Sequence, residues 1–153
     1  MLFKDTTLPT EALPSEAKDL NLLDLFVGYT SSFLWSPKAI DLDNFATISG
    51  DKNPLHMNGV YAQGRGFEGR VVHGFLIAAQ VSGLIGMLLP GRRCLLMDEK
   101  LGFPRPVYLG DKVLISGSVK TIHMELELIE LKIKATIDET TVMRGQVTCK
   151  LLS

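Results

Sequence analysis

The chain has 153 residues, which is the size of one domain with one substantial hydrophobic core. Its 16 basic and 17 acidic residues give a net charge of −1, so the composition argues against nucleic acid or an anionic membrane surface as a partner. Cys94 and Cys149 have neither the spacing of a zinc site nor the density of a disulfide framework. We therefore expect two half-buried apolar thiols in a reducing cytoplasm.

The N-terminal segment MLFKDTTLPTEALPSEAKDL has no basic stretch followed by an apolar core, so we do not expect export. Residues 1–19 carry two prolines and mixed charge without a clear period. We expect them to form an arm that packs on the body of the protein or on a neighbouring subunit. Residues 20–153 are expected to form a single domain.

The first elements after the arm are a strand and a helix. Tyr29–Trp35 has the composition of a strand, and Ile40–Ser49 carries apolar side chains at helical spacing. Asp41 is expected to cap this helix, and Gly50 to end it in the left-handed conformation that glycine tolerates best. Asp51 would then lie in the following turn.

A second, short helix is predicted to begin at Asn53 and Pro54, because Asn is a good N-cap and Pro fits the first helical position. His56 lies in its first turn. On one continuous helix, Asp51 and His56 would point about 140° apart. The predicted break between the two helices removes this obstacle to a contact.

The glycine-rich segment Gly59–Gly69 is expected to be a loop. The apolar stretch Phe75–Leu89 has 15 residues, against the roughly 20 that span a bilayer. It predicts a core helix that other structure wraps on most sides and that Pro90-Gly91 ends. Gly83 and Gly86 each cost roughly 1 kcal/mol relative to Ala, so we expect something to approach the helix closely there.

The remainder of the chain predicts an antiparallel sheet, with turn signals at Gly110-Asp111 and Asp138-Glu139. The phase of the apolar residues changes between Leu128 and Leu131, which predicts a bulge near Ile129. One buried helix against such a sheet is an α+β fold. The expected strands are Cys94–Phe103, Lys112–Met124, Leu126–Ile137 and Thr141–Leu152.

Four motifs, in this order and with these gaps, resemble the MaoC-like (R)-specific enoyl-CoA hydratases of the hotdog-fold superfamily. The resemblance extends from about Leu25 to Leu152, and residues 1–19 have no recognised counterpart. The motifs are SGDKNPLH at Ser49–His56, VVHGF at Val71–Phe75, LPG at Leu89–Gly91 and FPRPVYLGD at Phe103–Asp111.

The resemblance implies a curved antiparallel sheet wrapped around a long central helix, and a homodimer whose two sheets join edge to edge. It also implies reversible hydration of a trans-2-enoyl thioester to the (3R)-hydroxyacyl thioester, in fatty acid or polyhydroxyalkanoate metabolism. The substrate would be an acyl-CoA or an acyl carrier protein thioester. No cofactor and no metal are expected.

By position, Asp51 and His56 match the catalytic acid and histidine of the family, with Asn53 in support. Gly74 matches the glycine whose backbone N–H binds the thioester carbonyl, and Ser82 matches a serine on the central helix. The family commonly has an acidic residue at the position of Asn58, and its N-terminal arm is shorter. These departures concern carrier and oligomer contacts rather than the proposed chemistry.

Hydration of a conjugated thioester requires an activated water at the β carbon, a proton for the α carbon and relief of charge on the carbonyl oxygen. Asp51 and His56 can share the first two tasks, and either can return the proton. The N-terminus of the apolar helix at Gly74 suits the third. Ile85 and Phe75 are candidates to contact the acyl chain.

Alternative readings remain open at this stage. Without the other motifs, Asp51 would be a turn residue and His56 an ordinary helix-start residue. His73 is favoured as a hydrogen-bonded structural residue over a third active-site group, and zinc bound by Asp51, His56 and His73 would lack the usual spacing. Arg65 and Arg70 are expected on a solvated face rather than at the phosphates of a carrier.

Other functions on the same fold must also be weighed. A (3R)-hydroxyacyl carrier-protein dehydratase would run the same chemistry in reverse on a different handle. A thioesterase is less favoured, because it has no obvious use for the turn acid and the helix-start histidine. A non-catalytic acyl-binding domain would keep the apolar helix without needing either Asp51 or His56.

Overall fold

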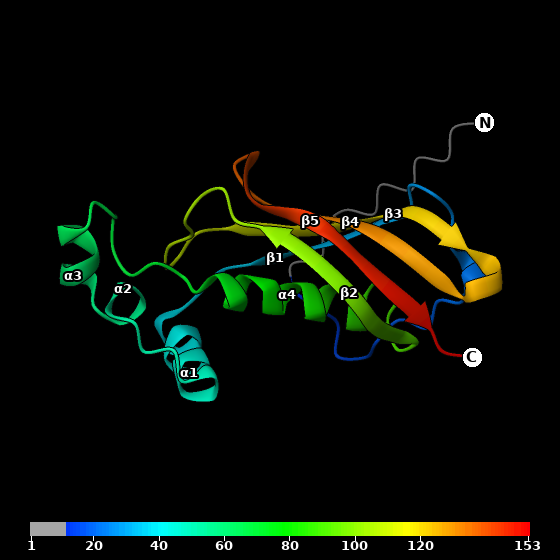
Figure 1. The fold of residues 1–153 in the computed structure, drawn as a ribbon, viewed down its shortest axis with the longest axis horizontal. Coiled ribbons are helices and arrows are strands. Elements are labelled where there is room, and N and C mark those ends of the chain that lie inside the picture. The colour runs from blue at the N-terminus through cyan, green and yellow to red at the C-terminus, as the bar shows by residue number, and fades with distance from the viewer. Residues whose placement is uncertain (1–11) are drawn as a thin grey trace.

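The computed structural model describes residues 12–153, and these form a curved antiparallel sheet of five strands in the order β1-β3-β4-β5-β2 (Figure 1). Every strand boundary falls within two residues of the sequence prediction. The strands are β1 (Thr30–Trp35), β2 (Cys94–Gly102), β3 (Val113–His123), β4 (Leu128–Ile137) and β5 (Thr140–Leu151).

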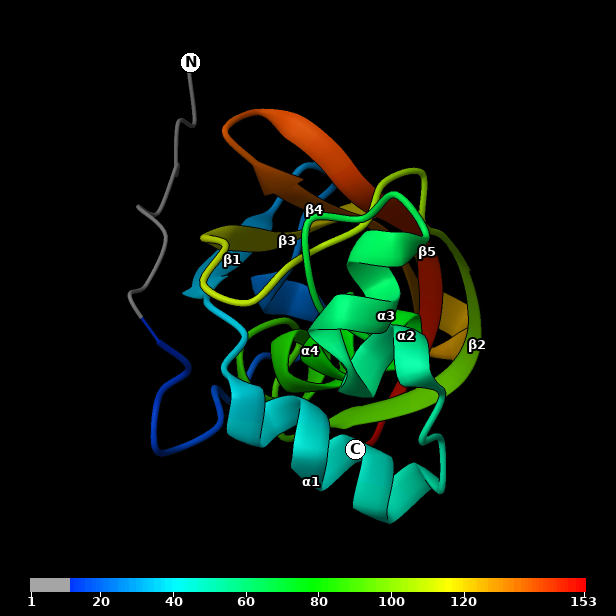
Figure 2. The same cartoon turned by 90° about the vertical axis from the view of Figure 1, so that its left-hand side faces the viewer.

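The sheet wraps around one long helix, α4 (Gly74–Met87), while three shorter helices lie together beyond its N-terminal end (Figures 1 and 2). Five apolar side chains of α4 are buried in the core that it shares with the inner face of the sheet. The expected α+β architecture is therefore confirmed. The shorter helices are α1 (Ala39–Ser49), α2 (Pro54–Met57) and α3 (Gly59–Gly64).

Strand β4 shows why the apolar pattern fixes which face of the sheet is buried. Leu131, Ile133 and Ala135 are buried, whereas Lys132 and Lys134 between them are exposed. Successive side chains point to opposite faces of a strand, so this alternation allows only one orientation. The turn to β5 at Asp138-Glu139 has positive φ at both residues (43° and 67°), as a tight hairpin requires.

The predicted bulge near Ile129 is present in the pairing of β3 with β4, but its extra residue is not in β4. Ile129 is buried in phase with Leu131, and the change of phase comes from a short 3-10 turn that ends at Glu127, in the left-handed conformation. The irregularity lies in the partner strand, because Lys120 of β3 is skipped where the pairing passes from Val119 to Thr121. Pairing with a neighbouring strand, rather than the pattern of β4 itself, determines this position.

Two helix starts differ from expectation. Lys38 rather than Asp41 is the N-cap of α1, but the Asp41 carboxylate accepts a hydrogen bond from the Lys38 backbone N–H at 2.8 Å, as in a capping box. The expected glycine-rich loop begins with α3 (Gly59–Gly64). The Asn58 side chain accepts from the Tyr61 N–H at 3.0 Å, and this cap starts a helix despite the glycines.

The described part of the N-terminal arm packs on the body, whereas residues 1–11 lie outside the described part of the chain. The Lys18 N–H donates to the Met87 carbonyl at the end of α4. A Cβ added at Gly83 would come within 2.7 Å of the Leu13 side chain, so this glycine is closely approached as expected. At Gly86 no described atom lies within 4 Å of such a Cβ.

Helix α4 was predicted to be buried in the core rather than to span a membrane. Its burial against the sheet confirms the first part of this prediction. Within residues 12–153, no helix has the length and hydropathy needed to cross a bilayer.

Candidate active site

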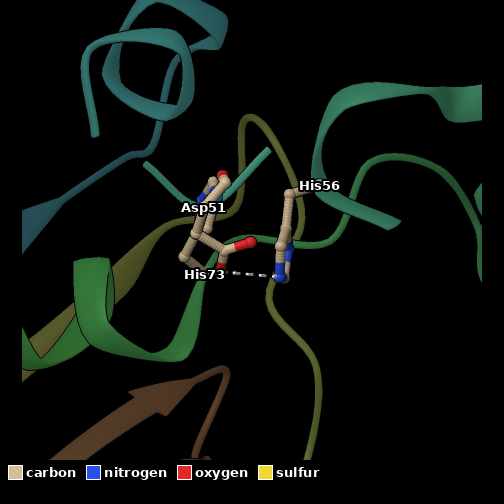
Figure 3. Close-up of side chains that lie close together, drawn as sticks. All are labelled: Asp51, His56 and His73. Carbon is tan, nitrogen blue, oxygen red and sulfur yellow. Dashed lines mark hydrogen bonds and ion pairs between the residues drawn. The ribbon is translucent and has the colours of Figure 1, made fainter. Parts of the chain in front are cut away.

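Three segments that are separate in the sequence meet beside the N-terminus of α4. The turn between α1 and α2 contributes Asp51, α2 contributes His56, and the residue before α4 contributes His73 (Figure 3). These three side chains offer acid or ring atoms that all lie within 4.8 Å of one another. The break between the two helices therefore brings Asp51 and His56 together, as the sequence predicted.

Local hydrogen bonds fix the turn that carries Asp51. Gly50 ends α1 with φ 78°, in the left-handed conformation that was expected. The Asp51 N–H donates to the Ser49 hydroxyl at 3.1 Å, and one Asp51 carboxylate oxygen accepts from the Asn53 N–H at 3.1 Å. The Asp51 side chain remains 49% exposed, so its other oxygen is accessible to water or substrate.

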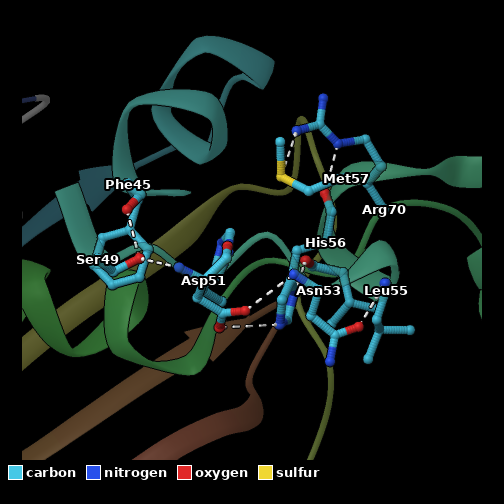
Figure 4. Close-up of polar contacts among 10 residues, drawn as sticks. Phe45, Ser49, Asp51, Asn53, Leu55, His56, Met57 and Arg70 are labelled. Carbon is cyan, nitrogen blue, oxygen red and sulfur yellow. Dashed lines mark hydrogen bonds and ion pairs between the residues drawn. The ribbon is translucent and has the colours of Figure 1, made fainter. Parts of the chain in front are cut away.

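His56 is held by its position in α2 and by one strong hydrogen bond. Asn53 caps this helix as predicted, with its side-chain oxygen accepting from the Leu55 N–H at 2.9 Å (Figure 4). The Nδ1 atom of His56 lies 2.7 Å from the Val71 carbonyl oxygen. Because a carbonyl only accepts, Nδ1 must carry the proton, which leaves Nε2 with a free lone pair in the neutral ring.

This lone pair faces the acid. His56 Nε2 lies 3.9 Å from Asp51 Oδ2 (Figure 4). That distance exceeds the usual range of a direct hydrogen bond. It suits a single water molecule that contacts both atoms. The His56 side chain is only 14% exposed, so such a water would be partly shielded from bulk solvent.

Gly74 is the first residue of α4, and its amide has no partner within the helix, as for the first N–H groups of any α-helix. The positive end of the helix dipole lies there as well. A Cβ at Gly74 would sit 3.8 Å from the Phe103 ring, so the glycine and this ring lie against each other. Phe103 opens the motif FPRPVYLGD but was not among the residues predicted for the site.

His73 is 2% exposed and stacks on His56, with ring centroids 3.9 Å apart and planes 25° apart. Its Nε2 lies 3.0 Å from the Asp51 backbone oxygen. Burial lowers the pKa of His73 below its ordinary value; His56 and Arg70 act in the same direction, while Asp51 opposes them. The expected hydrogen-bonded, buried residue is present, but its contacts join it to the candidate pair.

The lowered pKa of His73 predicts a pH-dependent stability. The unfolded chain binds a proton near the ordinary pKa of 6.5, whereas the folded ring binds it only at a lower pH. The stability contributed by the neutral His73 ring is complete above pH 6.5. It is lost as the pH falls below this value, by at most about 1.4 kcal/mol per pH unit. Urea unfolding between pH 7.5 and 5.5 should show a smaller loss in His73→Gln than in the wild type. Equal losses would contradict a depressed pKa.

Arg70 is not on a solvated face, contrary to expectation. Its side chain is 18% exposed, and its Nη2 forms an ion pair with Asp43 at 2.6 Å. Its Nε donates to the His56 backbone oxygen at 2.6 Å (Figure 4). Arg70 therefore ties α1 to α2 directly behind His56, a connection between distant segments that local sequence signals do not reveal.

Replacing Arg70 with Met should destabilise the protein by about 2 to 3 kcal/mol, because two charge-assisted hydrogen bonds are lost from a largely buried site. Urea denaturation followed by circular dichroism measures this. Arg65→Met is the matched control, since Arg65 lies only over the Tyr61 ring, 5.1 Å from its centroid. Equal losses of unfolding free energy in the two variants would show that the Arg70 hydrogen bonds to Asp43 and His56 contribute little to stability.

The other candidate residues lie along α4. Ser82 and Phe75 are exposed, the latter to 77%, whereas Ile85 is buried in the core at 4%. Contact of Ile85 and Phe75 with an acyl chain stays a prediction. The expectation that no metal takes part also stays a prediction, although Asp51, His56 and His73 are close enough for a small cation.

A model of the "MaoC like domain" family matches residues 28–143. The chain is 31% identical to an (R)-specific enoyl-CoA hydratase of Rhodospirillum rubrum over 125 residues, which are 82% of this chain and 87% of the relative. It is 38% identical to a mitochondrial 3-hydroxyacyl-[acyl-carrier-protein] dehydratase of Arabidopsis thaliana over 84 residues, which are 55% of this chain and 48% of the relative.

Among solved structures, the (R)-hydratase of Aeromonas caviae superposes with a TM-score of 0.81 at 30% identity. The superposition covers 84% of this chain and 98% of that one. This likeness confirms the fold class predicted from the sequence, a curved antiparallel sheet around a central helix.

Proposed function

We propose that this chain, which belongs to the MaoC-like domain family and has the hotdog fold, catalyses a hydration reaction. The reaction is the reversible (R)-specific hydration of trans-2-enoyl-CoA to (3R)-hydroxyacyl-CoA. The observation that carries this proposal is the pair of acceptors formed by His56 Nε2 and Asp51 Oδ2, 3.9 Å apart. The pair lies close to the amides at the start of α4. The relatives named hydratase and dehydratase support the same chemistry.

The pair would activate one water. Both Nε2 of neutral His56 and an ionised Asp51 accept hydrogen bonds, so a water between them presents its oxygen lone pair to the β carbon. As the oxygen bonds to that carbon, one proton passes to the pair. The pair returns a proton to the α carbon, which completes the addition of H and OH across the double bond. The reverse sequence is dehydration.

The negative charge that develops on the thioester oxygen requires a donor. The Gly74 N–H lies at the positive end of α4, where it can donate a hydrogen bond to the thioester oxygen. Loss of one such donor typically costs about 3 to 4 kcal/mol of transition-state stabilisation. The absence of a side chain at Gly74 lets the thioester approach the backbone.

Hydration of crotonyl-CoA, followed by the chirality of the product, tests the proposal. We expect loss of the enoyl absorbance and formation of (3R)-hydroxybutyryl-CoA. No hydration of any short or medium enoyl thioester would overturn the proposed reaction. Tight thioester binding without turnover, unaffected by His56→Ala, would favour a non-catalytic acyl-binding domain instead.

Dehydration of a (3R)-hydroxyacyl carrier-protein thioester is the second candidate, supported by the similarity to a plant carrier-protein dehydratase. The chemistry is the same, and only the group that carries the acyl chain differs: coenzyme A or a carrier protein. Crotonyl-CoA and crotonyl carrier protein, compared at equal concentration, separate the two by their kcat/KM values.

We propose a homodimer formed through strand β2. This edge strand is exposed along most of its length, and Leu95, Leu96 and Met97 are 47%, 44% and 56% exposed. A long apolar edge with unpaired backbone groups is normally covered in native proteins. Antiparallel pairing of β2 with its copy about a twofold axis would cover it.

Met97→Glu should raise the dimer dissociation constant by about tenfold or more, because a charge would enter an apolar interface. Sedimentation velocity at several concentrations measures this. Leu126→Glu is the matched control, since Leu126 is similarly exposed at 59% but lies in the turn before β4. A monomeric wild type, or equal effects of the two substitutions, would contradict the β2 interface.

Cys94 and Cys149 lie on the neighbouring strands β2 and β5, and both are free thiols in the described chain. Cys94 is half-buried as expected, whereas Cys149 is fully buried in the core. We propose a reducing compartment, the cytoplasm in the simplest case.

A further inference from the structure

His73 contacts both members of the Asp51 and His56 pair and directly precedes Gly74. Its Nε2 lies 3.0 Å from the Asp51 backbone oxygen, and its ring stacks on His56 at 3.9 Å between centroids. We propose that His73 is a positioning residue, which holds the turn of Asp51 and the ring of His56 so that both face one water. This inference rests on the proposed function.

The hydrogen bond assigns the tautomer of His73. The Asp51 carbonyl only accepts, so Nε2 of His73 carries the proton. Nδ1 is buried and has no hydrogen-bond partner among residues 12–153. A second proton at Nδ1 would put an unpaired donor and a charge into a buried site, which is costly. Burial therefore favours the neutral ring, with its single proton at Nε2.

A neutral His73 suits its place against His56. During the proposed reaction His56 would gain and lose a proton, and a charged ring stacked on it would repel the protonated form. A neutral ring lets His56 cycle without that repulsion. The charged or titratable groups around His73 are Asp51, His56 and Arg70, and its lowered pKa is consistent with this arrangement.

The ring of His73 is itself fixed from two sides. Phe45 of α1 contacts it with ring centroids 4.9 Å apart, in addition to the stack with His56. The backbone of His73 is the N-cap of α4. The His73 side chain thus both donates a hydrogen bond to Asp51 and stacks on His56. Because His73 directly precedes α4, these two contacts position Asp51 and His56 relative to the Gly74 amide.

Two substitutions separate the two contacts. His73→Gln keeps an N–H donor near the position of Nε2 but removes the ring, whereas His73→Phe keeps a ring and removes the donor. We expect each to lower kcat for crotonyl-CoA by about 10- to 100-fold with little change in KM, since misplacing reacting groups costs rate rather than binding. His123→Gln, at the sheet surface beside Glu130, is the control.

The folded fraction of each variant is measured by urea denaturation, and kcat is expressed per folded molecule. A purely structural role would lower the folded fraction and leave this corrected kcat unchanged. Corrected kcat values within about threefold of the wild type for both variants would overturn the inference. Wild-type hydration with unaffected His73 variants would leave the proposed function intact.

A second measurement needs no activity. The chain has 3 histidines, so the ring nitrogens can be assigned by ¹⁵N NMR with single His variants. At pH 8 we expect His73 to be neutral with its proton at Nε2, and His56 to carry its proton at Nδ1. In His73→Gln, the His56 ring signals should broaden because the ring stacked on it is lost, while the bond to the Val71 carbonyl keeps the proton at Nδ1. A protonated or Nδ1–H His73, or an unchanged His56, would overturn the inference even if no thioester is hydrated.

Discussion

Asp51→Asn is expected to lower kcat/KM for crotonyl-CoA by about 10²- to 10⁴-fold while the protein stays folded. The amide cannot accept a proton from water at neutral pH. Its oxygen can still accept from the Asn53 N–H, which holds the turn in the structure at 3.1 Å. Hydration is followed by the absorbance of the enoyl thioester, and folding by circular dichroism.

Asp41→Asn provides the matched control for Asp51. It makes the same chemical change in a carboxylate that bonds the Lys38 N–H at the start of α1. We expect its activity to stay within about threefold of the wild type, as for most changes away from reacting groups. Full activity of Asp51→Asn would remove the acid from the mechanism.

His56→Asn is expected to have a similar effect, again about 10²- to 10⁴-fold on kcat/KM. The Asn amide can donate to the Val71 carbonyl in place of Nδ1–H, so the local structure should be kept. The acceptor at Nε2 is lost, and no base then faces Asp51. The assay is the same, and His123→Asn makes the equivalent change on the sheet surface. Wild-type turnover of His56→Asn would show that His56 has only a structural role.

The double variant Asp51→Asn/His56→Asn tests whether the two groups act as a unit. Two groups that hold one water should be strongly non-additive, because loss of either already disables it. We expect the double variant to be at most about tenfold slower than the slower single variant. Multiplication of the two single losses would mean that the residues act on separate steps.

The local part of the site could be predicted from the sequence. Gly50 ends α1 and Asn53 starts α2 through interactions with residues only a few positions away. These signals were sufficient to place Asp51 in a turn and His56 in a first helical turn. The alternation in β4 fixed the orientation of the sheet in the same way, because each residue reports its own face.

Contacts between distant segments could not be predicted. The stack of His73 on His56 and the tie from Arg70 to Asp43 depend on how α1, α2 and the segment before α4 assemble. The bulge at Lys120 is likewise set by the partner strand. Helix α3 was missed for a different reason: the glycine content predicted a loop, while the single cap at Asn58 was sufficient to start a helix.

A crystal structure of the wild type with butyryl-CoA, a saturated thioester that cannot add water, tests the central claim most directly. We predict one ordered water within about 3 Å of both His56 Nε2 and an Asp51 carboxylate oxygen, beside the β carbon. The thioester oxygen should lie within about 3 Å of the Gly74 nitrogen. A thioester bound away from Gly74, or side chains of Asp51 and His56 that share no water, would contradict the account.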